Sequence, residues 1–354
     1  MVRRVVFAVP GDLDTPTGGY AYDKRVIAGL RENGWTVDVV DLGQNFPRPD
    51  AATRATAVAM LNRIPDGTPT VVDGLAYGVL PELAETVCRR APVIALVHHP
   101  LALESGLAAD DAARLRASER TALAAARAVL VTSDATARLL AADYGVPPGK
   151  ITVAPPGTDR VAAADRTGHA GPVALLAVGA LVPRKGYDVL LDALARLVDL
   201  DWRLTIVGPL DRDPATATAV AAQIMDLALA DRVTLAGAVA ADTLAAFYAG
   251  ADAFVLASRF EGYGMAFSEA LGYGLPVVGT TGGAIPDTVP AGAGLLVAPD
   301  DVEALALALR RVIGEPGTRE RLVRAAQAAS DRLPTWREAA RLVATTIETI
   351  EATR

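Results

Sequence analysis

Short apolar runs rich in β-branched residues alternate along this chain with longer segments of helical periodicity. The first half contains the runs "RVVFAV", "TVDVVDL", "TPTVVDG", "PVIALVH", "AVLVTS" and "ITVA", and the second half continues with "VALLAV", "RLTIVG", "RVTLAG", "AFVLAS", "LPVVGT" and "GLLVA". Between the first two runs, Tyr22, Val26, Ile27 and Leu30 recur at helical spacing before Gly34, a typical C-cap. Strands that are apolar throughout are typical of parallel sheets covered by helices on both faces. The sequence therefore predicts an α/β fold made of two doubly wound halves.

One stretch interrupts this alternation and marks the boundary between the halves. The segment "PPGTDRVAAADRTGHAGP" is rich in Pro, Gly and small polar residues and has no clear period. We therefore predict an N-terminal Rossmann-like domain over 1–160, a linker over 161–172, a second Rossmann-like domain over 173–333 and a final amphipathic helix over 334–354. Ligands of open parallel sheets bind beyond the carboxyl ends of the strands. Two such sheets facing each other predict a central cleft with its chemistry in the loops that follow strands.

The charge balance and the single cysteine exclude several classes of function. The 34 Lys and Arg residues face 41 Asp and Glu residues, for a net charge of -7, and no basic block suggests a nucleic-acid surface. Cys88 is the one cysteine, so no internal disulfide can form, and we expect a buried, inert thiol on an amphipathic helix.

No apolar run reaches the ~18 residues of a membrane span, and the first run is too short for a signal peptide. We expect a cytoplasmic protein with at most peripheral membrane contact.

Two loops after predicted strands carry residues suited to an anionic ligand. Gly18 and Gly19 follow the first strand and precede a helix, where glycines let the backbone approach a ligand at the helix N-terminus. Taken alone, this pair is better explained by a plain tight turn. Arg184 and Lys185 follow the strand "VALLAV", and two cations there suit a phosphate group, although a solvated charge pair is an equal alternative for this loop alone.

A third loop joins the strand "AFVLAS" to a helix through "RFEGYGMAFSEALGYG". Glu261 lies in the loop, Gly262 and Gly264 follow it, and Glu269 comes one turn into the helix. The glycines would leave backbone amides available to an anion, and carboxylates accept hydrogen bonds from sugar hydroxyls. A nucleotide sugar has both kinds of group. The simpler alternative is a surface loop followed by an exposed Glu269.

The stretch "ASRFEGYGMAFSEALGYGLPVV", followed by "GTTGGAIPDTV", resembles the signature of retaining glycosyltransferases of the family 4 type, which have the GT-B fold. Supporting matches in the same order include "GGYAYDKRVIAGLRENGW", "VLVTSDATARLLAADYGVPPGKITVAPPGTD", "VPRKGYDVLLDAL" and "FYAGADAFVLAS". The resemblance implies transfer of a sugar from a nucleotide diphosphate donor to a hydroxyl acceptor with retention of configuration. A UDP-sugar is the favoured donor and a GDP-sugar the next, and the acceptor would be a sugar, a lipid-linked molecule or another small molecule.

The same resemblance implies roles for individual residues. It makes Glu261, Lys185 and His98 catalytic: Glu261 lies beside the donor sugar, Lys185 stabilises the leaving diphosphate, and His98 reaches the donor-sugar pocket. It assigns the ribose hydroxyls to Glu269 and the acceptor-facing phosphate loop to Gly18 and Gly19. The implied nucleotide-sugar-binding residues are Gly18, Gly19, Arg184, Lys185, Gly262, Tyr263, Gly264, Met265 and Glu269.

The chain departs from the family pattern at Ala180, where an arginine that helps the lysine neutralise the diphosphate is usual. Arg184 could replace it, although an exposed role for Arg184 is at least an equal alternative, since family members often carry a charged residue at this position. No Asp-x-Asp motif lies in a suitable loop, so we expect no metal and no cofactor other than the nucleotide sugar itself as co-substrate. Two alternatives stay open from the sequence: a nucleotide-sugar epimerase-like GT-B enzyme, and a non-catalytic nucleotide-sugar-binding protein.

Overall fold

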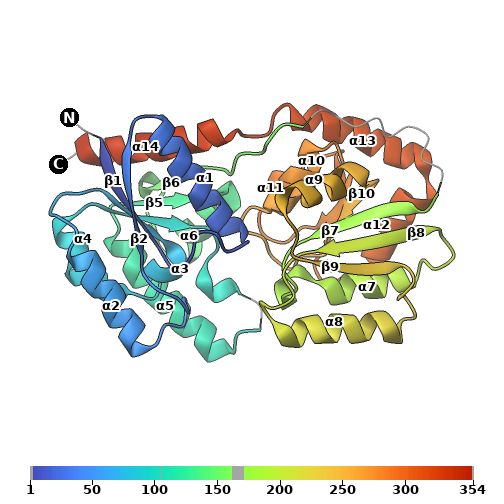
Figure 1. Cartoon of the computed structure of the whole chain (residues 1–354), viewed down its shortest axis with the longest axis horizontal. Coiled ribbons are helices and arrows are strands. Elements are labelled where there is room, and N and C mark those ends of the chain that lie inside the picture. The colour runs from blue at the N-terminus through green and yellow to red at the C-terminus, as the bar shows by residue number, and fades with distance from the viewer. Residues whose placement is uncertain (1–2, 105, 162–170, 353–354) are drawn as a thin grey trace. The chain divides into compact units, whose positions relative to one another are not determined.

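The computed structural model describes residues 3–104, 106–161 and 171–352, and the chain forms two compact units (Figure 1). The first unit comprises Met1–Gly157 together with Pro334–Arg354, and the second comprises Thr158–Leu333. Most of the predicted linker, residues 162–170, lies outside the described residues. In the described part of the chain, no helix is long and apolar enough to cross a membrane.

The sheet of the first unit has six parallel strands in the spatial order β2-β1-β3-β4-β5-β6. These strands are β1 (Arg4–Val9), β2 (Thr36–Asp41), β3 (Thr70–Asp73), β4 (Val93–Val97), β5 (Ala128–Val131) and β6 (Ile151–Val153). Side chains alternate between the two faces of a strand, and both faces of β1 are buried. Val5, Phe7 and Val9 join one apolar core, while Val6 and Ala8 join another, as a doubly wound sheet requires.

Helices cover both of these cores. The helices of the first unit are α1 (Gly18–Glu32), α2 (Ala51–Asn62), α3 (Gly74–Tyr77), α4 (Val87–Arg90), α5 (Ala109–Ala125), α6 (Asp134–Asp143) and α14 (Trp336–Ala352). The residues around Cys88 form a short 3₁₀ helix, Pro81–Glu85, and then α4, so the single amphipathic helix predicted there is wrong. Cys88 itself is half-buried rather than buried, with its Sγ 3.4 Å from the Tyr77 hydroxyl.

The C-terminal helix α14 lies along α1 (Figure 1). Gly29 of α1 makes the close approach possible, because a Cβ atom built there would lie 2.6 Å from the Cβ of Ala340. The rings of Tyr22 and Trp336 meet edge to face at a centroid separation of 6.0 Å. The end of the chain is therefore an integral part of the first unit.

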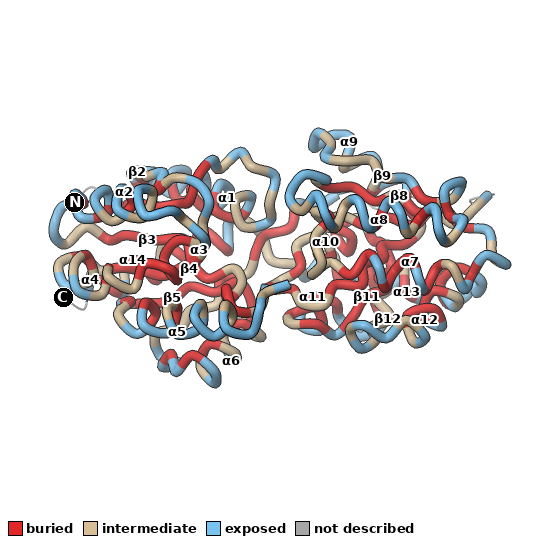
Figure 2. The backbone as a smooth tube through the Cα atoms, turned by 90° about the horizontal axis from the view of Figure 1, so that it is seen from below, coloured by how far each residue is buried: buried red, intermediate tan, exposed pale blue. Residues whose placement is uncertain are grey.

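The second unit repeats the architecture, with strand order β12-β11-β10-β7-β8-β9 and all neighbours parallel. Its strands are β7 (Val173–Val178), β8 (Trp202–Val207), β9 (Val233–Gly237), β10 (Ala253–Val255), β11 (Val277–Thr280) and β12 (Gly294–Val297). Its helices are α7 (Tyr187–Ala195), α8 (Pro214–Asp226), α9 (Ala241–Gly250), α10 (Met265–Gly272), α11 (Ile285–Thr288), α12 (Val302–Gly314) and α13 (Pro316–Ser330). Buried segments follow the strands in the interior of each unit, and exposed segments follow the outer helices (Figure 2). The predicted pair of doubly wound sheets is confirmed.

Candidate functional site

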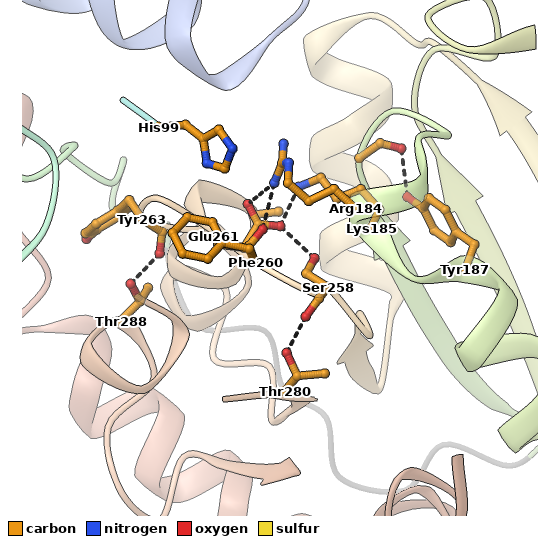
Figure 3. A network of polar contacts seen from close by, with 12 residues as sticks. His99, Arg184, Lys185, Tyr187, Ser258, Phe260, Glu261, Tyr263, Thr280 and Thr288 are labelled. Carbon is orange, nitrogen blue, oxygen red and sulfur yellow. Dashed lines mark hydrogen bonds and ion pairs between the residues drawn. The ribbon is translucent and has the colours of Figure 1, made fainter. Parts of the chain in front are cut away.

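The loop between β10 and α10 holds a buried carboxylate surrounded by cations and a hydroxyl (Figure 3). Lys185 Nζ lies 2.7 Å from Glu261 Oε1, and Arg184 Nη1 lies 3.1 Å from Glu261 Oε2. The Ser258 hydroxyl donates to Glu261 Oε1 at 2.6 Å. Glu261 is only 6% exposed. We call Arg184, Lys185, Ser258 and Glu261 the carboxylate cluster.

The electrostatics of the cluster keep Glu261 ionised. Burial alone would raise the pKa of this carboxyl. The charges of Lys185 and Arg184, with hydrogen bonds from Lys185 and Ser258, outweigh burial and lower the pKa to about 2. Within the cluster, two cations therefore meet one permanent anion. Lysine and arginine side chains placed together in this way are the donors that commonly bind phosphate oxygens.

Three glycines allow the backbone segments of the cluster to come together. Gly186 follows Lys185 with φ +64, and a Cβ there would lie 2.0 Å from the carbonyl oxygen of Ala257. Cβ atoms at Gly282 and Gly283 would lie 2.4 Å and 2.3 Å from the carbonyl oxygens of Arg259 and Glu261. A side chain at Gly186 would push the cation-bearing loop away from the end of β10, and one at Gly282 or Gly283 would push the segment after Thr280 away from the loop that carries Glu261.

Arg259 fastens the cation-bearing loop from outside the cluster. Its guanidinium binds the Asp188 carboxylate at 3.1 and 2.6 Å and the Asp300 carboxylate at 2.7 Å. Its backbone N–H donates to the carbonyl of Arg184 at 2.8 Å. The sequence reasoning missed Arg259, Ser258 and the glycines after Thr280. The one available signal was their position inside or beside the motif stretches.

Glu269 lies on α10, the helix that follows the loop, and does not share the ion pairs of the carboxylate cluster. The Tyr248 hydroxyl donates to its Oε2 at 2.9 Å, and burial raises the pKa of the Glu269 carboxyl. The side chain is half-buried, so the alternative of a fully exposed Glu269 is wrong. The two glutamates of the motif therefore have opposite electrostatic environments.

The start of α10 presents backbone groups rather than a capping side chain. Gly264 is the N-cap residue with φ +90, and no side chain among the described residues caps this end. Thr288 Oγ1 donates to the carbonyl of Tyr263 at 2.5 Å and holds the loop before the helix. Gly262, Tyr263, Gly264 and Met265 are thus the backbone of a helix N-terminus, where the partial positive charge favours an anion.

The other predicted site residues, Gly18, Gly19 and His98, lie in the first unit. Gly18 and Gly19 are the first two residues of α1 rather than residues before it, and Thr17 Oγ1 caps the helix by accepting from Tyr20 N at 3.2 Å. A Cβ at Gly19 would lie 3.3 Å from His98 Cδ2, so Gly19 gives room to the imidazole. The structure thus brings together Gly19 and His98 in one unit, and Arg184, Lys185 and Glu261 in the other.

Asp23, Asp73 and His98 form a group that could hold a metal ion, since one ligand atom from each lies within 4.8 Å of the others. The group is already linked by a direct contact, because His98 Nε2 lies 2.9 Å from Asp23 Oδ1. His98 Nε2 lies 3.7 Å from Asp73 Oδ2. The sequence reasoning missed both aspartates.

Comparison with known proteins finds one family match in each half of the chain. Residues 22–161 match the family model described as Glycosyltransferase Family 4, and residues 172–315 match the model described as Glycosyl transferases group 1. The chain belongs to the family 4 glycosyltransferases. The family resemblance inferred from the sequence motifs is confirmed.

Curated relatives of this family 4 chain include two bacterial enzymes. It is 34% identical over 253 residues to the D-inositol 3-phosphate glycosyltransferase of Actinosynnema mirum, covering 65% of this chain and 61% of the relative. It is 29% identical over 245 residues to the MMP alpha-(1->4)-mannosyltransferase of Mycolicibacterium hassiacum, covering 65% and 59%. The chain thus spans about three-fifths of the length of these relatives.

Solved structures show the same fold over nearly the whole family 4 chain. Sucrose-phosphate synthase from Thermosynechococcus elongatus superposes with a TM-score of 0.82 at 22% identity, covering 99% of this chain and 100% of that one. Anabaena HepE in complex with UDP and glucose gives a TM-score of 0.77 at 19% identity, covering 98% and 100%. The predicted GT-B fold is confirmed.

Proposed function

We propose that this family 4 chain transfers a sugar from a nucleotide diphosphate donor to a hydroxyl acceptor, with retention of anomeric configuration and without a metal ion. The observation that carries the proposal is the carboxylate cluster. Lys185 and Arg184 converge on the buried Glu261 at the carboxyl end of β10 and beside the N-terminus of α10. Ligands of parallel α/β sheets bind at this end of the strands.

The diphosphate of the donor is the anion that fits the cluster. Its oxygens would accept hydrogen bonds from Lys185, from Arg184 and from the amides at the start of α10. As the bond to the sugar breaks, negative charge grows on the leaving diphosphate, and the same donors stabilise that charge. Arg184 supplies the second cation that the family pattern places at Ala180, because Arg184 contacts the same carboxylate as Lys185.

The two glutamates contact different parts of the donor, the transferred sugar and the ribose. Glu261 remains ionised and lies beside the transferred sugar, where an anion can interact with its hydroxyls and with positive charge developing at the anomeric carbon. Glu269 accepts hydrogen bonds from the ribose hydroxyls, and it also accepts one from the Tyr248 hydroxyl. These assignments rest on the resemblance and on the placement of the two side chains.

UDP is the proposed nucleotide. HepE has been solved with UDP-glucose as well as with UDP, and its structure superposes on 98% of this chain. Two curated relatives are named MMP alpha-(1->4)-mannosyltransferase and D-inositol 3-phosphate glycosyltransferase, and the second name includes a phosphorylated polyol. A hydroxyl acceptor of this kind is the proposal for this chain.

The test is a panel of nucleotide sugars incubated with the protein and with polyol and sugar-phosphate acceptors. Product is detected by mass spectrometry, and its anomeric configuration is read by proton NMR. We expect a transferred sugar with the donor's configuration and equal rates in magnesium and in excess chelator. An inverted product, an epimerised donor without transfer, or tight binding without turnover would each contradict the proposal.

A further inference from the structure

Asp23 is a fully buried carboxylate that points from α1 toward His98. It is 0% exposed, and its Oδ1 lies 2.9 Å from His98 Nε2. The Asp23 carboxyl also lies beside the Asp73 carboxyl, and a hydrogen bond between the two acts to lower the pKa of Asp23. Burying an ionisable group costs several kcal/mol unless its contacts compensate, so a carboxylate at this position needs a polar partner. The contact with the imidazole is what distinguishes Asp23 from its apolar neighbours on α1.

The surroundings of His98 fix the ring as well as its contact atom. The ring of Tyr22 meets the imidazole edge to face at a centroid separation of 5.1 Å, and Gly19 leaves space against its Cδ2 edge. Tyr22 is itself held, because its hydroxyl donates to the carbonyl of Ala154 at 2.9 Å. The imidazole is therefore confined by packing before any ligand binds.

Asp73, at the end of β3, is the second carboxyl beside His98. Its Oδ1 accepts from the backbone N–H of Leu75 at 2.6 Å, which leaves Oδ2 at 3.7 Å from His98 Nε2. That distance is too long for a hydrogen bond, so Asp23 is the direct partner of the ring. The titratable groups that face His98 from the packed elements are Asp23 and Tyr22 of α1 and Asp73 of β3.

We infer that Asp23 is a positioning residue that accepts a hydrogen bond from the Nε2–H of His98 and thereby fixes the tautomer of the imidazole. In the neutral ring one nitrogen carries the proton and the other is an acceptor. Both polar contacts of His98 in the described part of the chain involve Nε2. Nδ1 is therefore the nitrogen that can accept a hydrogen bond from a hydroxyl of a sugar substrate. The identity of this ligand rests on the proposed function.

The two carboxyls can carry a proton without disturbing this arrangement. Burial raises the pKa of Asp73, and the neighbouring charge of Asp23 raises it further. Burial also raises the pKa of Asp23, and it lowers that of His98. With a proton on Asp73, the Asp23 carboxylate is still able to accept from the Nε2–H of His98. If Asp23 were protonated instead, its O–H would donate to Nε2 and Nδ1 would carry the ring proton.

Histidine nitrogen NMR distinguishes these arrangements directly, since the chain has only 3 histidines. The protein is labelled with ¹⁵N histidine and measured at about pH 8, where an ordinary imidazole is neutral. His98→Gln assigns the signals. We expect the wild-type His98 proton on Nε2 and its Nδ1 unprotonated. In Asp23→Asn the amide can donate to Nε2, so we expect a substantial population with the proton on Nδ1.

Kinetics of the same variants separate positioning from a purely structural role. We expect Asp23→Asn to lower kcat by about ten- to a hundredfold, as misplacement of a substrate-contacting group does, while UDP affinity stays within about twofold of wild type. Tyr22→Phe is the matched control, because it removes a buried hydrogen bond from the same helix but keeps the ring beside His98. It should leave the Nε2–H signature intact.

Three results would overturn the inference. They are a wild-type His98 with its proton on Nδ1, an Asp23→Asn variant with unchanged tautomer and kcat, or stoichiometric Mn²⁺ or Zn²⁺ binding that perturbs His98 and is required for turnover. If no nucleotide sugar is turned over at all, the proposed function fails while the NMR result still decides the role of Asp23.

Discussion

Replacing Glu261 by glutamine should destabilise the second unit strongly, because it removes the one anion of the carboxylate cluster and retains both cations. The glutamine amide has nearly the same shape, but its N–H₂ group would face Lys185 or Arg184 in place of an oxygen. The change is therefore electrostatic rather than steric. Breaking a buried ion pair by removing one partner costs about 3–5 kcal/mol.

The pKa of Glu261 gives an independent magnitude. It is lowered from an ordinary 4.5 to about 2, which corresponds to about 3 kcal/mol of stabilisation of the charged form. Because the folded-state pKa is the lower one, this stabilisation is fully present above the ordinary pKa. It is lost as the pH falls from about 4.5 toward 2. The difference between wild type and Glu261→Gln should therefore be largest near neutral pH and shrink in acid.

Native-state hydrogen exchange measures this effect within the unit that contains the cluster. The slowest amides of β10 and β11 should exchange about a hundredfold faster in Glu261→Gln at neutral pH, with little change in the strands of the first unit. Glu269→Gln is the matched control, since Glu269 accepts a hydrogen bond from the Tyr248 hydroxyl and does not share the ion pairs of the carboxylate cluster. It should increase the exchange rates of the same amides by about tenfold or less. UDP should restore protection more in Glu261→Gln than in wild type, because the diphosphate supplies the missing anion. Exchange within about twofold of wild type would refute the reasoning.

Four further outcomes follow from the site. Lys185→Ala should lower kcat by about a hundredfold to a thousandfold, as loss of a donor to developing charge does, and an unchanged rate in steady-state kinetics would show that Lys185 only supports the loop. Arg184→Ala should lower kcat by a comparable factor, and a normal rate would mean that Arg184 does not replace the cation missing at Ala180. Glu269→Ala should mainly raise the donor KM and weaken UDP binding by calorimetry, whereas a loss confined to kcat would contradict a ribose contact. Transfer should continue after exhaustive chelation, and activity restored only by added magnesium or manganese would exclude the metal-free mechanism.

The sequence predicted the architecture because the apolar runs and the helical periods each report burial of a whole element. The unbroken apolar strands required sheets covered on both faces, and β1 indeed contributes alternate side chains to two cores. Lys185 and Glu261 were recognisable from their motifs. Their mutual contact was not, since it joins residues 76 positions apart and depends on how two loops approach.

Asp23 is the clearest case of a buried residue that the helical periodicity of apolar residues does not predict. The helical spacing predicts a buried stripe on the first helix, and its four members are all buried: Tyr22, Val26, Ile27 and Leu30. Asp23 lies on the same buried face, and a charged residue within an apolar stripe was a signal available in the sequence. Its partner could not be inferred, because His98 follows strand β4 and lies 75 residues away in the sequence.

The claim that the carboxylate cluster binds a nucleotide diphosphate is tested most directly by comparing UDP with UMP in calorimetric titrations. The two ligands share base and ribose and differ by the β-phosphate. In the wild-type protein we expect UDP to bind at least about tenfold more tightly, since each charge-assisted hydrogen bond contributes about 1.5–3 kcal/mol. In Arg184→Ala/Lys185→Ala this preference should disappear while UMP affinity stays nearly constant. Equal affinities of UDP and UMP in the wild type, or a preference for UDP that survives the double substitution, would contradict the account.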